Sequence, residues 1–247
     1  MIRLSMEGGT ARIRLDRPER LNALSPQLLR DLMTVCEELA DDDSVDVVTL
    51  EGAGESFSAG ADLPEFGREL ATSPRVTADL GRVVCEAVAN LPQITMAIIR
   101  GHCVGGGLVL AATCDLRISA DDTRFSIPEL EVGIPLAWGG MAHLVRLVGE
   151  TVAADLVLSG RTFTADEALR AGFVSRVVAA PNLDAEASEL IEVIAGRAHL
   201  PLRVTKQQLR AIRGGTFRGV RDADALLECL ADPQASEHLR SSIERLR

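Results

Sequence analysis

Three consecutive glycines, Gly105, Gly106 and Gly107, follow a β-branched, apolar run from Ile94 to Ile99. The apolar run predicts a buried strand, and the small residues between the glycines and Asp115 predict a helix. The first N–H groups of a helix have no partner inside it and lie at the positive end of its dipole. They can bind an oxygen atom that carries or develops negative charge, and glycines let the ligand approach the backbone closely.

The same strand, glycine turn and helix also occur in dinucleotide and phosphate sites, or serve close packing alone. In this chain the glycines do not follow the G-x-G-x-x-G spacing, and no Lys-Ser or Lys-Thr pair comes after them. The spacing therefore disfavours a nucleotide site.

The composition narrows the class of protein further. The chain has 247 residues, a formal net charge of −10 and 47% hydrophobic residues, which suits one large globular domain or a core with a helical appendage. Its basic residues are scattered, so nucleic acid and anionic membranes are poor partners. No apolar run is long enough for a membrane span or a signal sequence, which predicts a cytoplasmic protein. The five cysteines are odd in number and lack metal-ligand spacing, so we expect reduced thiols and no metal site.

Strand and helix patterns alternate through most of the chain. We expect strands at 2–6, 11–16, 45–50, 94–99, 116–119, 123–127 and 173–178, and helices that begin near 25, 80, 105, 139, 151 and 164. Ser25-Pro26 and Thr164 are helix N-caps by type and spacing. From Leu183 onward the pattern is helical throughout. The fold class is α/β, with a sheet-rich core at residues 1–182 and a helical region at 183–247.

Three motifs together point to one family: SFSAGADL at 56–63, GHCVGGG with CDLRIS at 101–119, and SIPELEVG at 126–133. In this order they resemble the crotonase superfamily, which contains enoyl-CoA hydratases and isomerases. The segment RPERLNALS at 17–25 resembles the RP-x-x-x-NAL segment of that family. The resemblance implies a β-β-α spiral core, a C-terminal helical region that packs between subunits, and a homotrimer or hexamer.

The resemblance also implies the partner and the backbone groups of the site. An acyl-CoA thioester is the expected partner, and coenzyme A arrives as part of the substrate, so no separate cofactor is expected. The thioester oxygen is expected between the N–H groups of Ala61 and Gly106. Proton removal beside a thioester carbonyl makes an enolate, and two donors already in place stabilise the charge on its oxygen.

The glutamates decide which reaction is expected. By resemblance, hydratases carry one glutamate near the start of the GGG helix and a second in the P-E stretch. Here Val109 stands at the first position and Glu129 at the second. A single glutamate is typical of the Δ3,Δ2-enoyl-CoA isomerase branch, which GGGLVLAATCDLRI, RVTKQQLR and RDAD also resemble. Isomerisation needs no activated water; a hydratase with an atypical site and a non-catalytic acyl-CoA binder are the alternatives.

The remaining candidates have weaker support. By resemblance, coenzyme A lies along Arg20, Leu21, Ala23, Ser58, Ala59, Gly60, Asp62 and Leu63. Gly105, Val109 and Trp138 are further candidates for substrate binding. Trp138 packs in the core or lines the acyl pocket. Glu129 could instead be a loop carboxylate, and Glu131, two residues on, suits a surface charge. Asp62, Glu65 and Asp115 suit caps or structural hydrogen bonds, and His102 and His143 suit structural histidines because neither has a Ser, Cys or metal-spaced partner.

Overall fold

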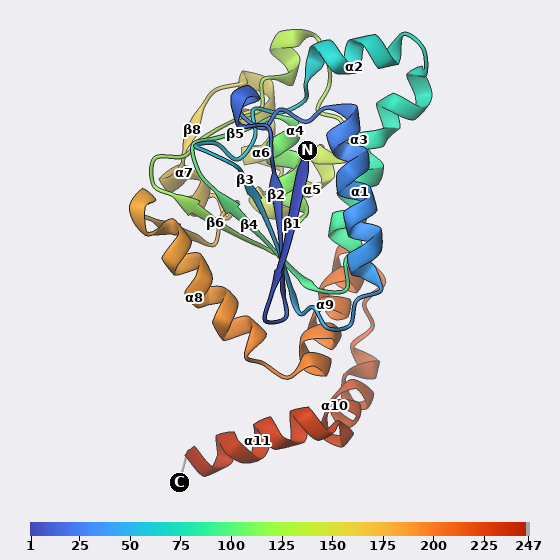
Figure 1. Cartoon of the computed structure of the whole chain (residues 1–247), viewed down its shortest axis with the longest axis vertical. Coiled ribbons are helices and arrows are strands. Elements are labelled where there is room, and N and C mark those ends of the chain that lie inside the picture. Colours follow the sequence, from blue (N-terminus) through green and yellow to red (C-terminus); the bar gives the residue numbers. More distant parts are fainter. Residues whose placement is uncertain (246–247) are drawn as a thin grey trace.

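A six-stranded sheet, in the order β1-β2-β3-β4-β6-β9, forms the centre of this computed structural model, which describes residues 1–245 (Figure 1). Its strands are β1 (Ile2–Glu7), β2 (Thr10–Leu15), β3 (Val47–Gly52), β4 (Ile94–Ile99), β6 (Leu116–Ala120) and β9 (Arg176–Val178). β1 and β2 form an antiparallel hairpin, and the other neighbouring strands are parallel. Parallel neighbours need long crossover connections, which explains the helices between the strands.

A smaller, three-stranded sheet lies next to the start of α4. It contains β5 (His102–Val104), β7 (Arg124–Ser126) and β8 (Phe163–Thr164), in that order. β5 ends directly before the glycines that begin α4. This sheet therefore fixes where the first turn of α4 lies.

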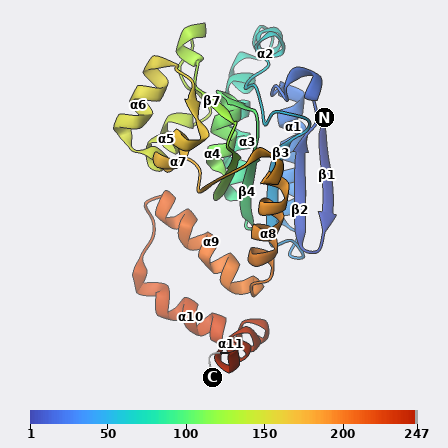
Figure 2. The same ribbon diagram turned by 90° about the vertical axis from the view of Figure 1, so that its left-hand side faces the viewer.

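Helices cover the central sheet on both faces (Figure 2). The helices of the core are η1 (Pro18–Arg20), α1 (Pro26–Ala40), α2 (Leu63–Leu70), α3 (Pro74–Asn90), α4 (Gly106–Thr113), η2 (Glu129–Val132), α5 (Gly140–Val148), α6 (Glu150–Ser159) and α7 (Ala165–Arg170). Those of the C-terminal region are η3 (Ala180–Asn182), α8 (Leu183–Ala195), α9 (His199–Arg213), η4 (Gly219–Arg221), α10 (Asp222–Ala231) and α11 (Pro233–Arg245). Within residues 1–245, none of the helices has the length and apolar character needed to cross a bilayer.

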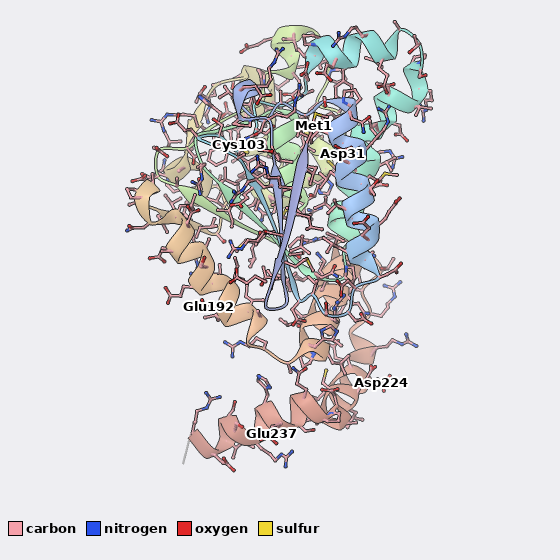
Figure 3. All side chains as sticks on the ribbon, viewed as in Figure 1. Met1, Asp31, Cys103, Glu192, Asp224 and Glu237 are labelled. Carbon is pink, nitrogen blue, oxygen red and sulfur yellow. The ribbon has the colours of Figure 1, made fainter. Side chains whose placement is uncertain are left out.

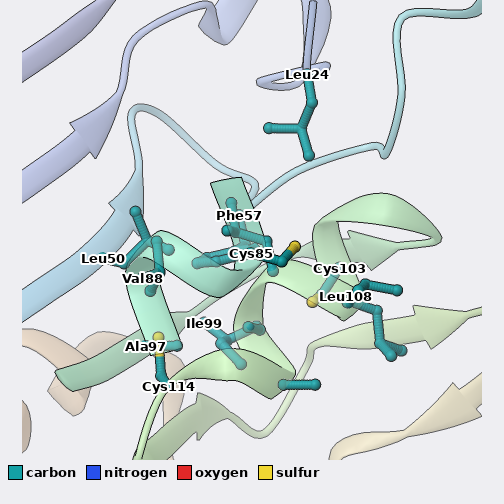
Figure 4. Close-up of a cluster of buried hydrophobic side chains, with 14 of the residues drawn as sticks. Leu24, Leu50, Phe57, Cys85, Val88, Ala97, Ile99, Cys103, Leu108 and Cys114 are labelled. Atoms are coloured by element: carbon teal, nitrogen blue, oxygen red, sulfur yellow. The ribbon is translucent and has the colours of Figure 1, made fainter. Parts of the chain in front are cut away.

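The larger core lies between the sheet and helices α1, α3 and α4 (Figure 4). Leu50 and Ala97 of the sheet share this cluster with Phe57, Val88 and Leu108. Cys36, Cys85, Cys103 and Cys114 are buried and free. Burial raises the pKa of their thiols, that of Cys36 to about 12, so these cysteines are protonated core residues.

A second cluster lies on the other face of the sheet and contains residues of α8. Leu183, Ala187 and Ile191 pack there against Val47 and Met96 of the sheet. α8 is therefore packed on the sheet of its own chain. α10 and α11 extend beyond the sheet at the bottom of the view, where Asp224 and Glu237 are exposed (Figure 3).

Each predicted strand and core helix is present, but several differ in length from the prediction. The Ser25 hydroxyl accepts from Leu28 N at 3.1 Å, and Thr164 caps α7 in the same way. The strand expected at 173–178 was too long, because only Arg176–Val178 pair with β6. The helix expected from residue 80 begins at Pro74, and α2, β5 and β8 were not predicted.

Candidate active site

Backbone pairing brings Ala61 beside the start of α4. Ser58 N donates to His102 O at 2.9 Å, and Val104 N donates to Ser58 O at 3.0 Å, which attaches the loop to β5. A Cβ added to Gly60 would lie 3.6 Å from Gly106 N. The loop that carries Ala61 therefore lies against the N-terminus of α4.

Within residues 1–245, neither the N–H of Ala61 nor that of Gly106 donates a backbone hydrogen bond. Leu24 bridges the loop by donating to Gly60 O at 2.8 Å and accepting from Asp62 N at 2.9 Å, which bypasses Ala61 N. Gly106 is the first residue of α4, so its N–H has no partner within the helix. These two donors suit an oxygen that becomes negative during a reaction.

Arg17, which the sequence analysis did not single out, binds the end of the same loop. Its guanidinium donates to Ala23 O at 2.8 Å and lies 3.1 Å from Asp62 Oδ2 and 2.9 Å from Glu65 Oε1. The Asp62 side chain also caps α2 by accepting from Glu65 N. The expected structural roles of Asp62 and Glu65 are confirmed, and both link the loop to the RPERLNAL segment.

Glu129 lies on η2 with one carboxylate oxygen close to the glycine turn. A Cβ added to Gly105 would lie 2.5 Å from Glu129 Oε1, which is too close for a side chain. Gly105 also has φ +49°, a backbone conformation that favours glycine. Oε2 is buried without a hydrogen-bond partner in the described part of the chain. Burial raises the pKa of Glu129 above its ordinary value, and a backbone hydrogen bond opposes the shift.

An apolar cavity of about 310 Å³ connects these groups. It is lined by Ala61, Leu63, Phe66, Gly67, Leu70, Ala78, Gly106, Val109, Glu129, Ile134, Pro135, Leu136, Ala137 and Trp138. Among these lining residues, Glu129 is the only one with an ionisable side chain. Val109 is 1% exposed and contributes a hydrocarbon wall to the cavity.

The cavity brings together six of the predicted residues: Ala61, Leu63, Gly106, Val109, Glu129 and Trp138. Gly105 adjoins it through Glu129. Arg20, Leu21, Ala23, Ser58, Ala59, Gly60 and Asp62 lie outside its lining, on the two segments that Leu24 and Ala61 connect. The Ser58 side chain is fully buried, and its hydroxyl is satisfied within the protein because it donates to Asn22 O and accepts from Gly60 N. Its contribution to a ligand site is therefore limited to shaping the loop.

The other ionisable candidates lie outside the cavity. Asp115 accepts from Thr95 N at 2.8 Å, which confirms its structural role, and Glu131 is exposed. His143 Nδ1 lies 3.1 Å from Arg146 Nη2, and burial together with Arg146 lowers the pKa of His143 to about 4. Within residues 1–245, no cluster of His, Cys, Asp and Glu could hold a metal ion.

Comparison with known proteins agrees with this geometry. Residues 5–245 match the enoyl-CoA hydratase/isomerase family. The short-chain-enoyl-CoA hydratase of Clostridium acetobutylicum is 34% identical over 98% of this chain and 94% of its own length. The crystal structure of an enoyl-CoA hydratase from Bacillus anthracis superposes with a TM-score of 0.92 at 30% identity, over 99% of this chain and 96% of that one. An enoyl-CoA hydratase/carnithine racemase from Magnetospirillum magneticum gives a TM-score of 0.92 at 33% identity, over 99% and 92%.

The chain therefore belongs to the enoyl-CoA hydratase/isomerase family and is an enzyme with the crotonase fold. It acts on coenzyme A thioesters. The expected fold and family are confirmed, and the alternative of a non-catalytic binder is disfavoured.

Proposed function

We propose that this enzyme isomerises 3-enoyl-CoA to 2-enoyl-CoA, with Glu129 as its single acid–base group. The observation that carries the proposal is the Glu129 carboxylate, which faces an otherwise apolar cavity and has one oxygen without a hydrogen-bond partner among residues 1–245. Such a group is costly to bury unless a ligand uses it. No separate cofactor is needed, because coenzyme A is part of the substrate.

The reaction follows from the position of the donors and the base. The thioester oxygen accepts from Ala61 N and Gly106 N, and Glu129 removes a proton from C2 of the 3-enoyl group. The electron pair of that C–H bond forms a dienolate, whose charge rests on the thioester oxygen and on C4. The two N–H groups stabilise the oxygen, and protonated Glu129 returns the proton to C4. The double bond thereby moves from C3–C4 to C2–C3, and Glu129 ends as it began.

Hydration of 2-enoyl-CoA is the second candidate, because the similar proteins of Clostridium acetobutylicum and Bacillus anthracis are named hydratases. With Val109 in the cavity wall, Glu129 alone would have to activate water and supply the proton. General acid–base catalysis contributes about 10²–10⁴-fold, so hydration with one glutamate is expected to be slow.

Purified enzyme offered 3-enoyl-CoA and 2-enoyl-CoA in separate assays tests the proposal. The assay of 3-enoyl-CoA measures the appearance of the conjugated 2-enoyl thioester. The assay of 2-enoyl-CoA measures the disappearance of the same conjugated thioester. Rapid hydration without isomerisation would replace the proposed function by the second candidate.

Val109→Glu is expected to raise hydration of 2-enoyl-CoA from a low baseline. The substitution adds a carboxylate to α4, the helix that supplies the Gly106 donor. The gain is expected to be small, because Val109 packs closely on α5: a Cβ added to Gly140 would lie 2.5 Å from Val109 Cγ2. Val109→Gln, which has the same shape without the charge, is the matched control. Equal hydration rates for the two variants would exclude the second carboxylate as the cause.

We also propose that α10 and α11 contribute to a homotrimer or a hexamer. Leu226, Leu227 and Leu230 on α10 are 60%, 64% and 44% exposed, and Leu239 and Ile243 on α11 are 45% and 44% exposed. Apolar side chains exposed in such number favour burial against another subunit. Sedimentation velocity at micromolar concentration is expected to give a trimer or hexamer; a monomer would contradict the proposal.

A further inference from the structure

The indole of Trp138 occupies a space that two glycines leave free. A Cβ added to Gly81, on α3, would lie 2.0 Å from Trp138 Cε2, and one added to Gly106 would lie 2.4 Å from Trp138 Cζ3. No side chain larger than hydrogen fits at either position while the ring is in place. Trp138, Gly81 and Gly106 are therefore complementary in size.

The backbone at Trp138 holds the ring in this position. Trp138 has φ +58°, a left-handed conformation that is rare for a bulky residue, and Gly139 follows with φ +73°. Gly140 N donates to Ala137 O at 2.9 Å, which closes the turn. The ring also packs against Phe66, with centroids 5.8 Å apart and planes inclined by 39°. Such strain at the wall of a cavity is typical of functional sites.

The ring lies beside the proposed reacting atoms. Gly106 supplies a donor for the thioester oxygen, and its neighbour Gly105 lies against Glu129. The indole edge nearest Gly106 therefore lies on the side of the cavity where the proposed function places the thioester. Leu63, Leu70 and Ile134 line the same cavity.

We propose that Trp138 determines substrate specificity by selecting acyl groups that are unbranched next to the reacting carbons. A straight aliphatic chain passes the flat indole, whereas a methyl branch at C3 would collide with the ring, which occupies the space that Gly81 and Gly106 leave free. This inference rests on the proposed position of the thioester oxygen. It names the substrate class as linear aliphatic acyl-CoA.

Binding of saturated thioesters tests the inference without requiring turnover. Calorimetry compares butanoyl-CoA with 3-methylbutanoyl-CoA for the wild type, Trp138→Leu and Trp138→Gly; glycine suits the left-handed backbone and guards against a folding defect. One methyl group in an apolar pocket changes selectivity by about 10–200-fold. We expect the wild type to favour the linear ligand by at least about tenfold, and both variants to lose most of that preference.

A second set of variants tests whether the glycine pair positions the ring. Gly81→Ala is expected to displace the indole and weaken binding of both ligands, and to be tolerated in a Trp138→Leu background, where no ring is displaced. Val76→Ala, on the same helix α3 but 69% exposed, is the control and should leave the preference unchanged.

The outcomes separate this inference from the proposed function. If neither ligand binds the wild type, the proposed thioester site fails, and the inference fails with it. If both ligands bind and the preference is the same with and without the indole, the role of Trp138 alone is overturned.

Discussion

Glu129→Gln is expected to lower the rate of 3-enoyl-CoA isomerisation by about 10²–10⁴-fold, the usual contribution of a positioned acid–base group. The amide keeps the shape of the side chain beside Gly105 and leaves the Ala61 and Gly106 donors in place. Affinity for a saturated acyl-CoA should therefore change little, so the loss is expected in kcat and not in KM. Steady-state kinetics with 3-enoyl-CoA, together with calorimetry, measures both quantities.

The same substitution is expected to stabilise the fold at neutral pH. Burial raises the folded-state pKa of Glu129, so the folded protein binds its proton more tightly than the unfolded chain does. The stability that Glu129 contributes is present below its unfolded pKa and is lost as pH rises through the folded value. At pH 7, where an exposed glutamate would be ionised, the burial of Glu129 therefore costs stability, which glutamine removes. Chemical denaturation should show Glu129→Gln to be at least as stable as the wild type at pH 7, with the difference shrinking in acid.

Glu131→Gln is the matched control, because Glu131 lies on the same short helix η2 but is exposed. It should change neither rate nor stability by much. A Glu129→Gln enzyme with full isomerase activity would exclude Glu129 as the base. A destabilised Glu129→Gln at pH 7 would instead assign this carboxylate a structural role.

Much of the backbone part of the site is predictable because it depends on local chemistry. A glycine turn between an apolar strand and a helix can be recognised from Ile94 to Asp115 alone, and the structure places Gly106 at the first residue of α4. Ser25 and Thr164 cap helices as their types and spacing predict. Each of these features depends on residues that are close in sequence.

The parts that were not predicted depend on contacts between distant segments. α2 is short, and its cavity residue Phe66 meets Trp138 only after the chain has folded. The turn at 134–137 has no periodic pattern, although it lines much of the cavity. Arg17 attaches to Asp62 across 45 positions, and nothing local to either residue indicates that pairing.

A further distant contact connects the C-terminal end of α4 to the C-terminal region. Asp115 follows α4, and its carboxylate meets Lys206 Nζ at 2.5 Å and Arg213 Nη2 at 2.7 Å, both from α9. The side chains of Asp115 and Lys206 are 4% and 1% exposed. Burial alone would raise the pKa of Asp115, but the charge and hydrogen bond of Lys206, with help from Thr95 and Arg213, lower it overall.

Lys206→Met is expected to destabilise the folded enzyme by about 3–5 kcal/mol, the usual cost of removing one partner from a buried ion pair. The loss should fall at the lower end, because Arg213 and Thr95 still contact Asp115. The lowered folded-state pKa means that the stability contributed by Asp115 is present at neutral pH and is lost as pH falls through that value. The difference between wild type and Lys206→Met should therefore shrink in acid.

Urea denaturation at pH 7 and at acidic pH measures this effect, with Arg240→Met as the control. Arg240 pairs with Glu237 on α11, but the two side chains are 69% and 63% exposed, so its removal should cost little. Since Lys206 lies outside the cavity, the folded variant should keep its thioester affinity below its melting temperature. Unchanged stability would show that Arg213 alone satisfies Asp115. A loss of affinity without a loss of stability would instead mean that α9 positions the Gly106 donor through α4.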